Sequence, residues 1–240
     1  MPKSLTVLMA ITVATLAAGC QTSTVKAAQA VAGAPQTTVR AGEWRSLVDG
    51  NSLAAWRGYK RDTVPAGWSA IDGVVSKTRP VADIVTRDEF GDFELSLEWK
   101  ISKGGNAGVF YRGTEEYDRI YWTAPEYQLL DDDNTPDGKN PLTRAATAYG
   151  LYARTAGELK PVGEWNEARI IARGAHVEHW LNGIKTIEYD LWSPDWLAKV
   201  KASKFSEWPN YGLAKRGRIA LQGDHLGRLD FRNVKIRELP

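Results

Sequence analysis

Three short segments of this chain combine charged or amide side chains with aromatic residues in patterns typical of β-strands. They are residues 106–112 (NAGVFYR), 126–131 (EYQLLD) and 221–225 (LQGDH). Such polar groups are costly to bury without partners, so strands that carry several of them indicate a surface that binds a polar ligand. The chain also holds 10 Trp and 9 Tyr among its 240 residues. Flat rings stack on sugar faces, and we therefore predict a carbohydrate ligand.

Successive side chains of a β-strand point to opposite faces of its sheet, so each polar side chain of these segments can be assigned to one face. Glu126 and Gln128 are two residues apart and share a face, opposite two apolar neighbours. The same rule turns Arg112 and Gln222 away from the core. We expect one concave surface to be lined by Arg112, Glu126, Gln128 and Gln222.

Each of these residues also has a structural interpretation. Arg112 and Glu126 could form an ion pair across neighbouring strands, and the two glutamines could satisfy backbone groups. Asp131 has the parity opposite to Glu126, so we expect it to end its strand or hold the next loop rather than act as a second catalytic acid. His225 follows a glycine in a predicted loop and could be functional or simply exposed.

The period of the apolar residues is mostly two, which predicts an all-β fold. Residues 93–101 (FELSLEWKI) alternate apolar and polar side chains without a break. Residues 176–181 and 184–189 flank Asn182-Gly183, the pair most typical of a two-residue hairpin turn. The last strand, 228–239, changes phase, and a bulge near residues 232–233 would reconcile its two halves. Many short strands and few helices predict a β-sandwich of jelly-roll type.

One short helix is predicted after residue 193. Ser193 can cap it, Pro194 suits its first position, and Asp195 favours the positive end of its dipole. Apolar residues then follow at helical spacing, and the helix should end before Pro209.

The N-terminus is typical of a targeting segment. A positive start is followed by an apolar stretch, residues 5–18, that is short for a bilayer span. Residues 16–20 (LAAGC) resemble a lipobox, which predicts a signal peptide over 1–19, lipidation of Cys20, a flexible tether over 20–40 and a folded domain over 41–240. The alternative is an ordinary secretory signal. The lipoprotein interpretation predicts a bacterial cell-envelope location, membrane-anchored and facing the periplasm or the exterior.

Charge and composition argue against several other classes. Of the 31 Lys and Arg residues, Lys3 alone lies in 1–19, so 30 basic residues face 29 acidic ones after its removal. Near-neutral charge without a basic block argues against a nucleic-acid partner. Cys20 is the only cysteine, so no disulfide forms within the chain. No cofactor is predicted. The acidic loop at 131–138 could bind Ca²⁺, but its glycine is misplaced for an EF-hand and a solvated turn is favoured.

An ordered set of segments resembles the 3-keto-disaccharide hydrolase family over residues 43–239. The segments are 47–56 (LVDGNSLAAW), 106–112, 126–131, 150–152 (GLY), 163–166 (GEWN), 180–183 (WLNG), 219–222 (IALQ) and 231–234 (FRNV). The chain departs from the family at Ala107, where a serine is usual, and in the shifted Gly223-Asp224-His225. These departures concern substrate choice more than fold.

This resemblance implies a concanavalin A-like jelly-roll sandwich and cleavage of 3-keto-glycosides. In such a substrate the ketone acidifies the C2 proton, so a base can form an enolate that expels the C1 substituent, and water can then add to the enone. We assign Glu126 as the base and Arg112 as the group that stabilises the enolate oxygen. His225 is assigned as the proton donor, because histidine is the side chain suited to proton transfer near neutral pH. Further substrate-binding candidates are Gln128, Gln222, Asn106, Asp131 and Tyr152.

The oxidised substrate implies a separate sugar 3-oxidoreductase upstream, because this chain has no dinucleotide-binding motif. Two other functions stay open. The first is a non-catalytic carbohydrate-binding module on the same fold, and the second is a retaining glycosidase that pairs Glu126 with another carboxylate.

Overall fold

The computed structural model of this chain describes residues 42–240. The predicted signal peptide (1–19), the lipidation site Cys20 and the tether (20–40) lie outside the described residues. None of the helices in the described part is long and apolar enough to cross a bilayer.

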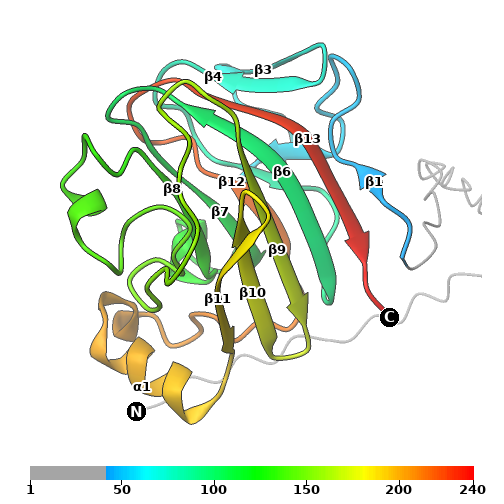
Figure 1. Cartoon of the computed structure of the whole chain (residues 1–240). Coiled ribbons are helices and arrows are strands. Elements are labelled where there is room, and N and C mark those ends of the chain that lie inside the picture. Colours follow the sequence, from blue (N-terminus) through cyan, green and yellow to red (C-terminus); the bar gives the residue numbers. More distant parts are fainter. Residues whose placement is uncertain (1–41) are drawn as a thin grey trace, which may run out of the picture. The chain divides into compact units, whose positions relative to one another are not determined.

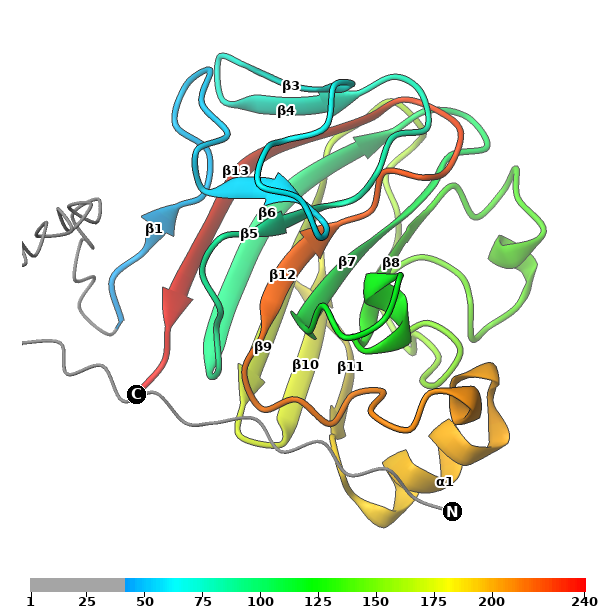
Figure 2. The ribbon, with the colours of Figure 1, turned by 180° about the vertical axis from the view of Figure 1, so that it is seen from behind.

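Two antiparallel sheets form the domain, as Figures 1 and 2 show from opposite sides. The eight-stranded sheet has the order β11-β10-β9-β6-β13-β4-β3, with β1 beside β13. Its strands are β1 (Arg45–Ser46), β3 (Trp68–Ile71), β4 (Val74–Lys77), β6 (Phe93–Ile101), β9 (Asn166–Arg173), β10 (His176–Leu181), β11 (Ile184–Asp190) and β13 (Leu229–Glu238).

The five-stranded sheet has the order β2-β5-β12-β7-β8. Its strands are β2 (Trp56–Gly58), β5 (Ile84–Thr86), β7 (Asn106–Gly113), β8 (Glu126–Leu130) and β12 (Arg218–Leu221). Three 3₁₀ helices occur in the connections: η1 (Ile120–Trp122), η2 (Asp137–Lys139) and η3 (Lys204–Glu207). Figure 2 shows η1, in green, beside β7 and β8.

The hydrophobic core lies between the two sheets and takes alternate side chains from each. Leu95, Leu97 and Trp99 of β6 belong to it, together with Tyr127 and Leu129 of β8. A jelly-roll β-sandwich is thus confirmed, and its physical basis is the period-two pattern that gives each strand one apolar face.

Several local predictions are confirmed. β6 has the predicted bounds, and Asn182 and Gly183 both have positive φ (50° and 81°) in the β10–β11 turn, as a type I′ turn requires. The pairing of β13 with β6 shifts register between Arg232 and Lys235, and Asn233 has φ 52°. This is the predicted bulge, which keeps the apolar side chains of both halves of β13 in the core.

The predicted helix is α1 (Pro194–Ala202). The Ser193 hydroxyl accepts a hydrogen bond from the Trp196 amide at 3.1 Å, and Pro194 is the first helical residue. A second serine, Ser203, ends α1 and caps η3 by accepting from the Phe205 amide at 3.1 Å. These two caps turn the chain so that Lys204 and Phe205 reach the five-stranded sheet.

Candidate active site

A pocket of about 220 Å³ lies against the outer face of the five-stranded sheet, where β7, β8 and β12 are neighbours. It is lined by Asn106, Tyr121, Glu126, Gln128, Asp137, Tyr149, Lys204, Phe205, Gln222, Asp224 and His225. Five predicted site residues from three separate segments meet here: Asn106, Glu126, Gln128, Gln222 and His225. Strand alternation therefore placed the β8 and β12 residues correctly, although loops cover the surface more than the sequence indicated.

Glu126 lies over a gap that a glycine provides. In the antiparallel pairing of β7 with β8, Glu126 is opposite Phe110 and Gln128 is opposite Gly108. A Cβ added to Gly108 would lie 2.3 Å from Oε1 of Glu126 and 2.8 Å from its Cδ. The carboxylate thus occupies the space where another residue would carry its side chain.

Burial strongly perturbs the titration of Glu126. The residue is 8% exposed, and desolvation raises the pKa of its carboxyl to about 8, with the positive charge of Lys204 acting in the opposite direction. With the Gln128 amide turned to satisfy its surroundings, its nitrogen donates to Oε1 of Glu126 at 2.7 Å and to the Ala107 carbonyl at 3.0 Å. Glu126 is therefore a fixed carboxyl that can gain or lose a proton near neutral pH.

Two other polar groups at the pocket have no hydrogen-bond partner within the described chain. They are Oε1 of Gln222 and Oδ1 of Asp224. Buried polar atoms are normally paired, so unpaired atoms at a pocket wall indicate places where a polar ligand binds.

Two buried ionisable side chains, Asp83 and Lys77, bind the backbone of the loop that carries Asp224 and His225. Asp83 accepts the Gly223 amide at 2.8 Å, and burial raises the pKa of its carboxyl to about 7. Lys77 donates to the carbonyl oxygens of His225 and Gly227. These contacts fix the backbone, while the His225 imidazole stays partly exposed with Nε2 at 3.7 Å from Oδ1 of Asp224.

The positively charged side chain of Lys204 also lines the pocket, and the sequence did not predict it as a site residue. Its Nζ lies 4.4 Å from the centre of the Tyr149 ring, and its charge lowers the pKa of Glu126 against the effect of burial. A sequence signal did exist: Lys204 continues the apolar series Trp196 and Val200 at intervals of four, where a lysine is unexpected. The pocket residues Tyr121, Asp137 and Tyr149 come from loops and 3₁₀ helices, and no periodicity marked them, whereas Phe205 shares the helical spacing that continues from α1.

The prediction that Arg112 lies in this site is wrong. Its guanidinium is buried elsewhere, donating to the carbonyl oxygens of Gly91 (2.9 Å) and Gly174 (2.7 Å) and to Asp92 (3.1 Å). The cause is local: Arg112 has φ 52°, and the β7–β12 register shifts opposite it, so the alternation rule fails at this residue.

Two substrate-binding predictions are also corrected. Asp131 is outside the pocket and accepts from the amides of Gly104 (2.7 Å) and Asn134 (3.3 Å), so it holds the following loop. Tyr152 donates to Asp195 at 2.7 Å, and its ring stacks on Tyr189 at 4.6 Å. Both side chains have structural partners in place of a ligand.

Ala107, the departure from the family's usual serine, is fully buried in the core between the sheets. The missing hydroxyl therefore concerns core packing on the side of β7 that faces away from the pocket.

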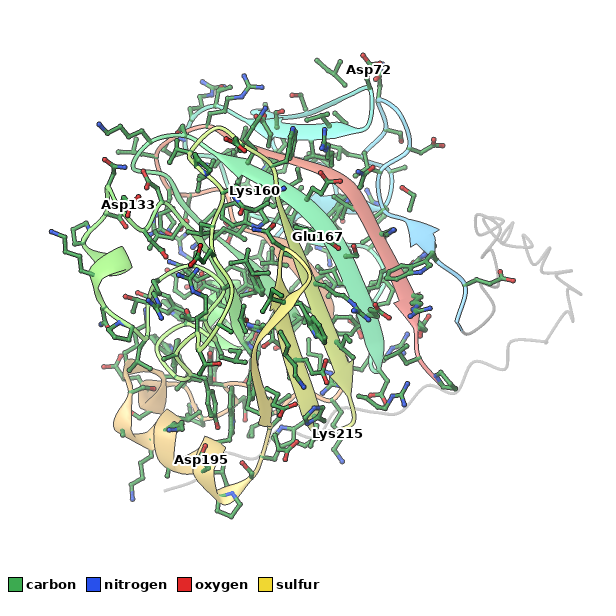
Figure 3. All side chains as sticks on the ribbon, in the orientation of Figure 1. Asp72, Asp133, Lys160, Glu167, Asp195 and Lys215 are labelled. Atoms are coloured by element: carbon green, nitrogen blue, oxygen red, sulfur yellow. The ribbon has the colours of Figure 1, made fainter. Side chains whose placement is uncertain are left out.

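A larger hollow of about 610 Å³ lies elsewhere, between residues 130–134 and 158–166. Asp133 and Lys160, both labelled in Figure 3, are among its lining residues. Two of its carboxylates have protein donors: Asp131 binds the Gly104 amide (2.7 Å), and Asp132 binds the Ala145 amide (2.7 Å) and Arg154 (3.2 Å). Trp99 and Arg154 of this hollow also carry buried nitrogens that are unpaired within the described part of the chain, so unpaired atoms do not separate the two. The smaller pocket is the better candidate because it gathers five predicted site residues, among them Glu126 with its raised pKa.

Within residues 42–240, one group of three side chains has metal-ligand spacing: His176, Glu178 and Glu188 on the β10–β11 hairpin. Lys185 already contacts both glutamates, with Nζ at 3.6 Å from Glu178 and 2.6 Å from Glu188. The carboxylates of this cluster thus already share a lysine, and the cluster lies on the eight-stranded sheet, whereas the pocket lies on the outer face of the five-stranded one.

Comparison with known proteins gives a consistent result. The profile of the 3-keto-alpha-glucoside-1,2-lyase-like domain matches residues 43–237. A Bacteroides thetaiotaomicron protein named 3-keto-disaccharide hydrolase is 35% identical over 236 residues, covering 85% of this chain and 81% of that protein. The crystal structure of a provisionally assigned glycosyl hydrolase from Parabacteroides distasonis superposes with a TM-score of 0.77 at 32% identity, over 82% of this chain and 94% of the other.

A second solved structure from the same organism, also provisionally assigned as a glycosyl hydrolase, has a TM-score of 0.64 at 32% identity and covers 82% of this chain and all of its own. Since the family profile spans nearly all of the described residues and the curated relative covers most of the chain, this protein belongs to the 3-keto-alpha-glucoside-1,2-lyase-like family, whose members include that 3-keto-disaccharide hydrolase.

Proposed function

We propose that this protein cleaves the glycosidic bond of 3-keto-glycosides, including 3-keto-disaccharides, by elimination followed by hydration. Family membership and the name of the 35% identical relative support the substrate class. The observation that carries the mechanism is the state of Glu126, a buried carboxyl with a pKa of about 8 at the floor of a polar pocket.

Glu126 is suited to remove the C2 proton. The neighbouring C3 ketone acidifies that proton, and a desolvated carboxylate with a raised pKa is a stronger base than an exposed one. The Gln128 amide fixes one carboxylate oxygen, so the other can face the substrate. Proton transfer to Glu126 leaves the electron pair of the C2–H bond in an enolate, with its negative charge on the C3 oxygen.

Lys204 takes the role that the sequence alone gave to Arg112. Its positive charge already acts on Glu126, so it is close to where the enolate charge develops. Although Lys204 is an exposed residue, its ammonium group acts on a pocket whose carboxyl is desolvated, and there a positive charge stabilises the enolate more strongly than it would in bulk water. The unpaired Gln222 amide offers a further hydrogen bond to the sugar.

His225 is proposed as the proton donor to the leaving oxygen. The enolate electrons form the C1–C2 double bond, the C1–O bond breaks, and the departing oxygen takes a proton from the imidazolium. Water then adds its hydroxyl to C1 of the enone and gives its remaining proton to His225. The Glu126 carboxyl exchanges its proton with the solvent once the leaving group has departed, and it then protonates C2. The balance of these steps is hydrolysis.

The pocket also bears on the two alternative functions. A binding module has no need for a buried carboxyl that titrates near neutrality, which favours an enzyme. Asp137 and Asp224 share the pocket with Glu126, so a two-carboxylate glycosidase is the competing mechanism. Such an enzyme would cleave the unoxidised sugar and would leave the C2 hydrogen in place.

The proposed substrate must come from a separate oxidoreductase that converts the C3 hydroxyl of a glycoside to a ketone. Lipidation at Cys20 would place the present protein in the bacterial cell envelope, where it would meet carbohydrate from outside the cell.

The test is to incubate the protein with 3-keto-trehalose and with trehalose in D₂O. Elimination should cleave only the oxidised sugar and place deuterium at C2 of the keto product. Glu126→Gln should abolish turnover, whereas Glu167→Gln, on the outer face of the eight-stranded sheet (Figure 3), should leave it unchanged. Cleavage of trehalose itself, or a product without deuterium, would contradict the proposal.

A further inference from the structure

Two tryptophans from distant segments stack on each other beside the pocket. The rings of Trp122 and Trp208 are 5.3 Å apart at their centres and 12° from parallel. Trp122 ends η1 and Trp208 follows η3, so each belongs to a connection rather than to a sheet. Both are only partly buried, although a tryptophan that served packing alone would gain most from full burial.

Each tryptophan adjoins a residue that lines the pocket. Tyr121 is in the pocket wall and meets Trp122 edge-on at 5.9 Å. Phe205 is also in the wall, and its ring centre lies 6.5 Å from that of Trp208. One wall side chain therefore separates each ring of the stacked pair from the pocket, and we call this partly exposed pair and its polar neighbours the rim.

Polar groups accompany the aromatic pair. The exposed Asn210 donates from Nδ2 to Oε1 of Glu116 at 2.7 Å, which links the segment after Trp208 to the loop before Trp122. That loop is anchored in turn, because the Tyr59 hydroxyl donates to the Tyr117 carbonyl at 2.6 Å. The rim thus combines flat apolar rings with an amide and a carboxylate that can bind hydroxyl groups.

The volume of the pocket indicates what must lie at this rim. At about 220 Å³ it is smaller than the ~300–1,000 Å³ clefts that hold drug-sized ligands. It has room for one sugar ring over Glu126, and the group attached through C1 must then lie outside.

We propose that Trp122 and Trp208 form the subsite for the leaving group, which is a ring: a second sugar or an aromatic aglycone. This inference rests on the proposed function, since it takes the keto ring to occupy the pocket. It makes the protein selective for glycosides whose leaving group can stack, over those with a small alkyl leaving group.

The experiment compares 3-keto-trehalose with methyl 3-keto-α-glucoside on the full chain. Trp208→Ala should lower kcat/KM for the disaccharide about tenfold, mainly through KM, the size expected for loss of one aromatic stacking contact, and should leave the methyl glycoside within about twofold. Trp208→Tyr, which keeps a flat ring, should restore much of the loss. Trp44→Ala, a tryptophan beside β1 that is 40% exposed, is the matched control.

If Trp208→Ala lowers kcat/KM equally for both substrates, the tryptophan pair is part of the pocket wall. If kcat/KM is unchanged for both, the pair does not bind substrate. Either result overturns the proposed subsite. A binding measurement keeps this test separate from the chemistry. Calorimetric titration of trehalose and methyl α-glucoside into the Glu126→Gln protein should show a preference for the disaccharide that Trp208→Ala removes, whether or not the elimination mechanism is correct. Equal affinities for the two sugars would also overturn the subsite.

Discussion

At the residue scale, the chemistry depends on one carboxyl kept out of water. Desolvation is the main cause of the raised pKa of Glu126, and the lysine charge nearby limits the rise. A base with a pKa near the working pH combines a useful deprotonated fraction with the strength to take a carbon-bound proton. The same burial has a cost in stability that can be measured.

Burial of Glu126 should make the folded protein less stable as the pH rises. The pKa of its carboxyl is about 8 when folded and ~4.3 when unfolded, so between those values the folded state retains a proton that the unfolded chain has lost. The free energy of unfolding should therefore fall from about pH 5 to pH 8 and then level off. Glu126→Gln should lose this slope, gaining several kcal/mol relative to wild type by pH 8, at ~1.4 kcal/mol per pKa unit.

Urea unfolding of both proteins at several values between pH 5 and pH 9 measures this difference. Asp83, whose pKa is also raised, titrates in both proteins, and its charge raises the pKa of Glu126, so the difference between the two curves reports Glu126 together with its coupling to Asp83. Parallel stability curves would mean that Glu126 is hydrated and ordinarily acidic.

Lys204 should affect both rate and pH dependence. Lys204→Gln should lower kcat/KM for 3-keto-trehalose by about 10²-fold, the usual effect of removing one oxyanion-stabilising donor. Because the lysine charge lowers the pKa of Glu126, its removal should also move the ascending limb of the pH profile to higher pH. Lys201→Gln, in the last turn of α1, is the matched control. A rate loss without a shift of the limb would show that Lys204 only shapes the pocket.

At the element scale, the pairing of β7 with β8 and β12 creates the pocket floor. Gly108 leaves a gap in β7 that the Glu126 side chain fills, and the backbone N–H of Gln222 donates to the Gly108 carbonyl at 3.0 Å. The cap residues Ser193 and Ser203 then turn α1 and η3 so that Lys204 covers that floor. The proposed base, Glu126, thus comes from a regular strand, whereas the positive charge of Lys204 comes from an irregular connection.

Gly108→Ala should damage catalysis more than folding. The new Cβ would lie 2.3 Å from Oε1 of Glu126, so the carboxylate must move by an ångström or more. Displacement of that size can cost about 10² in rate, whereas one added methyl group typically costs about 1–3 kcal/mol of stability. Gly91→Ala is the control, because its Cβ would meet nothing closer than 3.7 Å. Normal kcat/KM in Gly108→Ala would mean that the position of Glu126 is not critical.

At the scale of the whole domain, Arg112 links parts of both sheets. Its guanidinium joins the end of β7 to the segment before β6, through Gly91 and Asp92, and to the β9–β10 turn at Gly174. Its side chain is 2% exposed, so its charge depends on these partners.

Arg112→Met should therefore reduce stability without a specific effect on catalysis. We expect the free energy of unfolding to fall by ~3 kcal/mol, because two carbonyl oxygens lose their donor and the ion pair of the buried guanidinium with the partly exposed Asp92 is broken. Unfolding in urea measures the loss, and kcat per folded molecule at low temperature should stay within a few-fold of wild type. Unchanged stability with a large fall in kcat would return Arg112 to the catalytic site.

The sequence by itself determined the elements and the facing of most strand residues. Period-two alternation fixed β6 and β8, turn chemistry fixed the β10–β11 hairpin, and a phase change revealed the bulge in β13. These features depend on neighbours within a few positions, which a sequence displays directly. Glu126, Gln128 and Gln222 followed from strand alternation, whereas Asn106 and His225 were candidates from the segments that carry them.

Only the tertiary structure decided which charges act together. Lys204 enters the pocket because two helix caps redirect the chain, and Arg112 leaves it because one residue adopts a left-handed conformation. The unpaired atoms of Gln222 and Asp224 and the raised pKa of Glu126 depend on what covers them from distant segments. Electrostatics and desolvation are set by distances in space, and sequence separation carries little information about those distances.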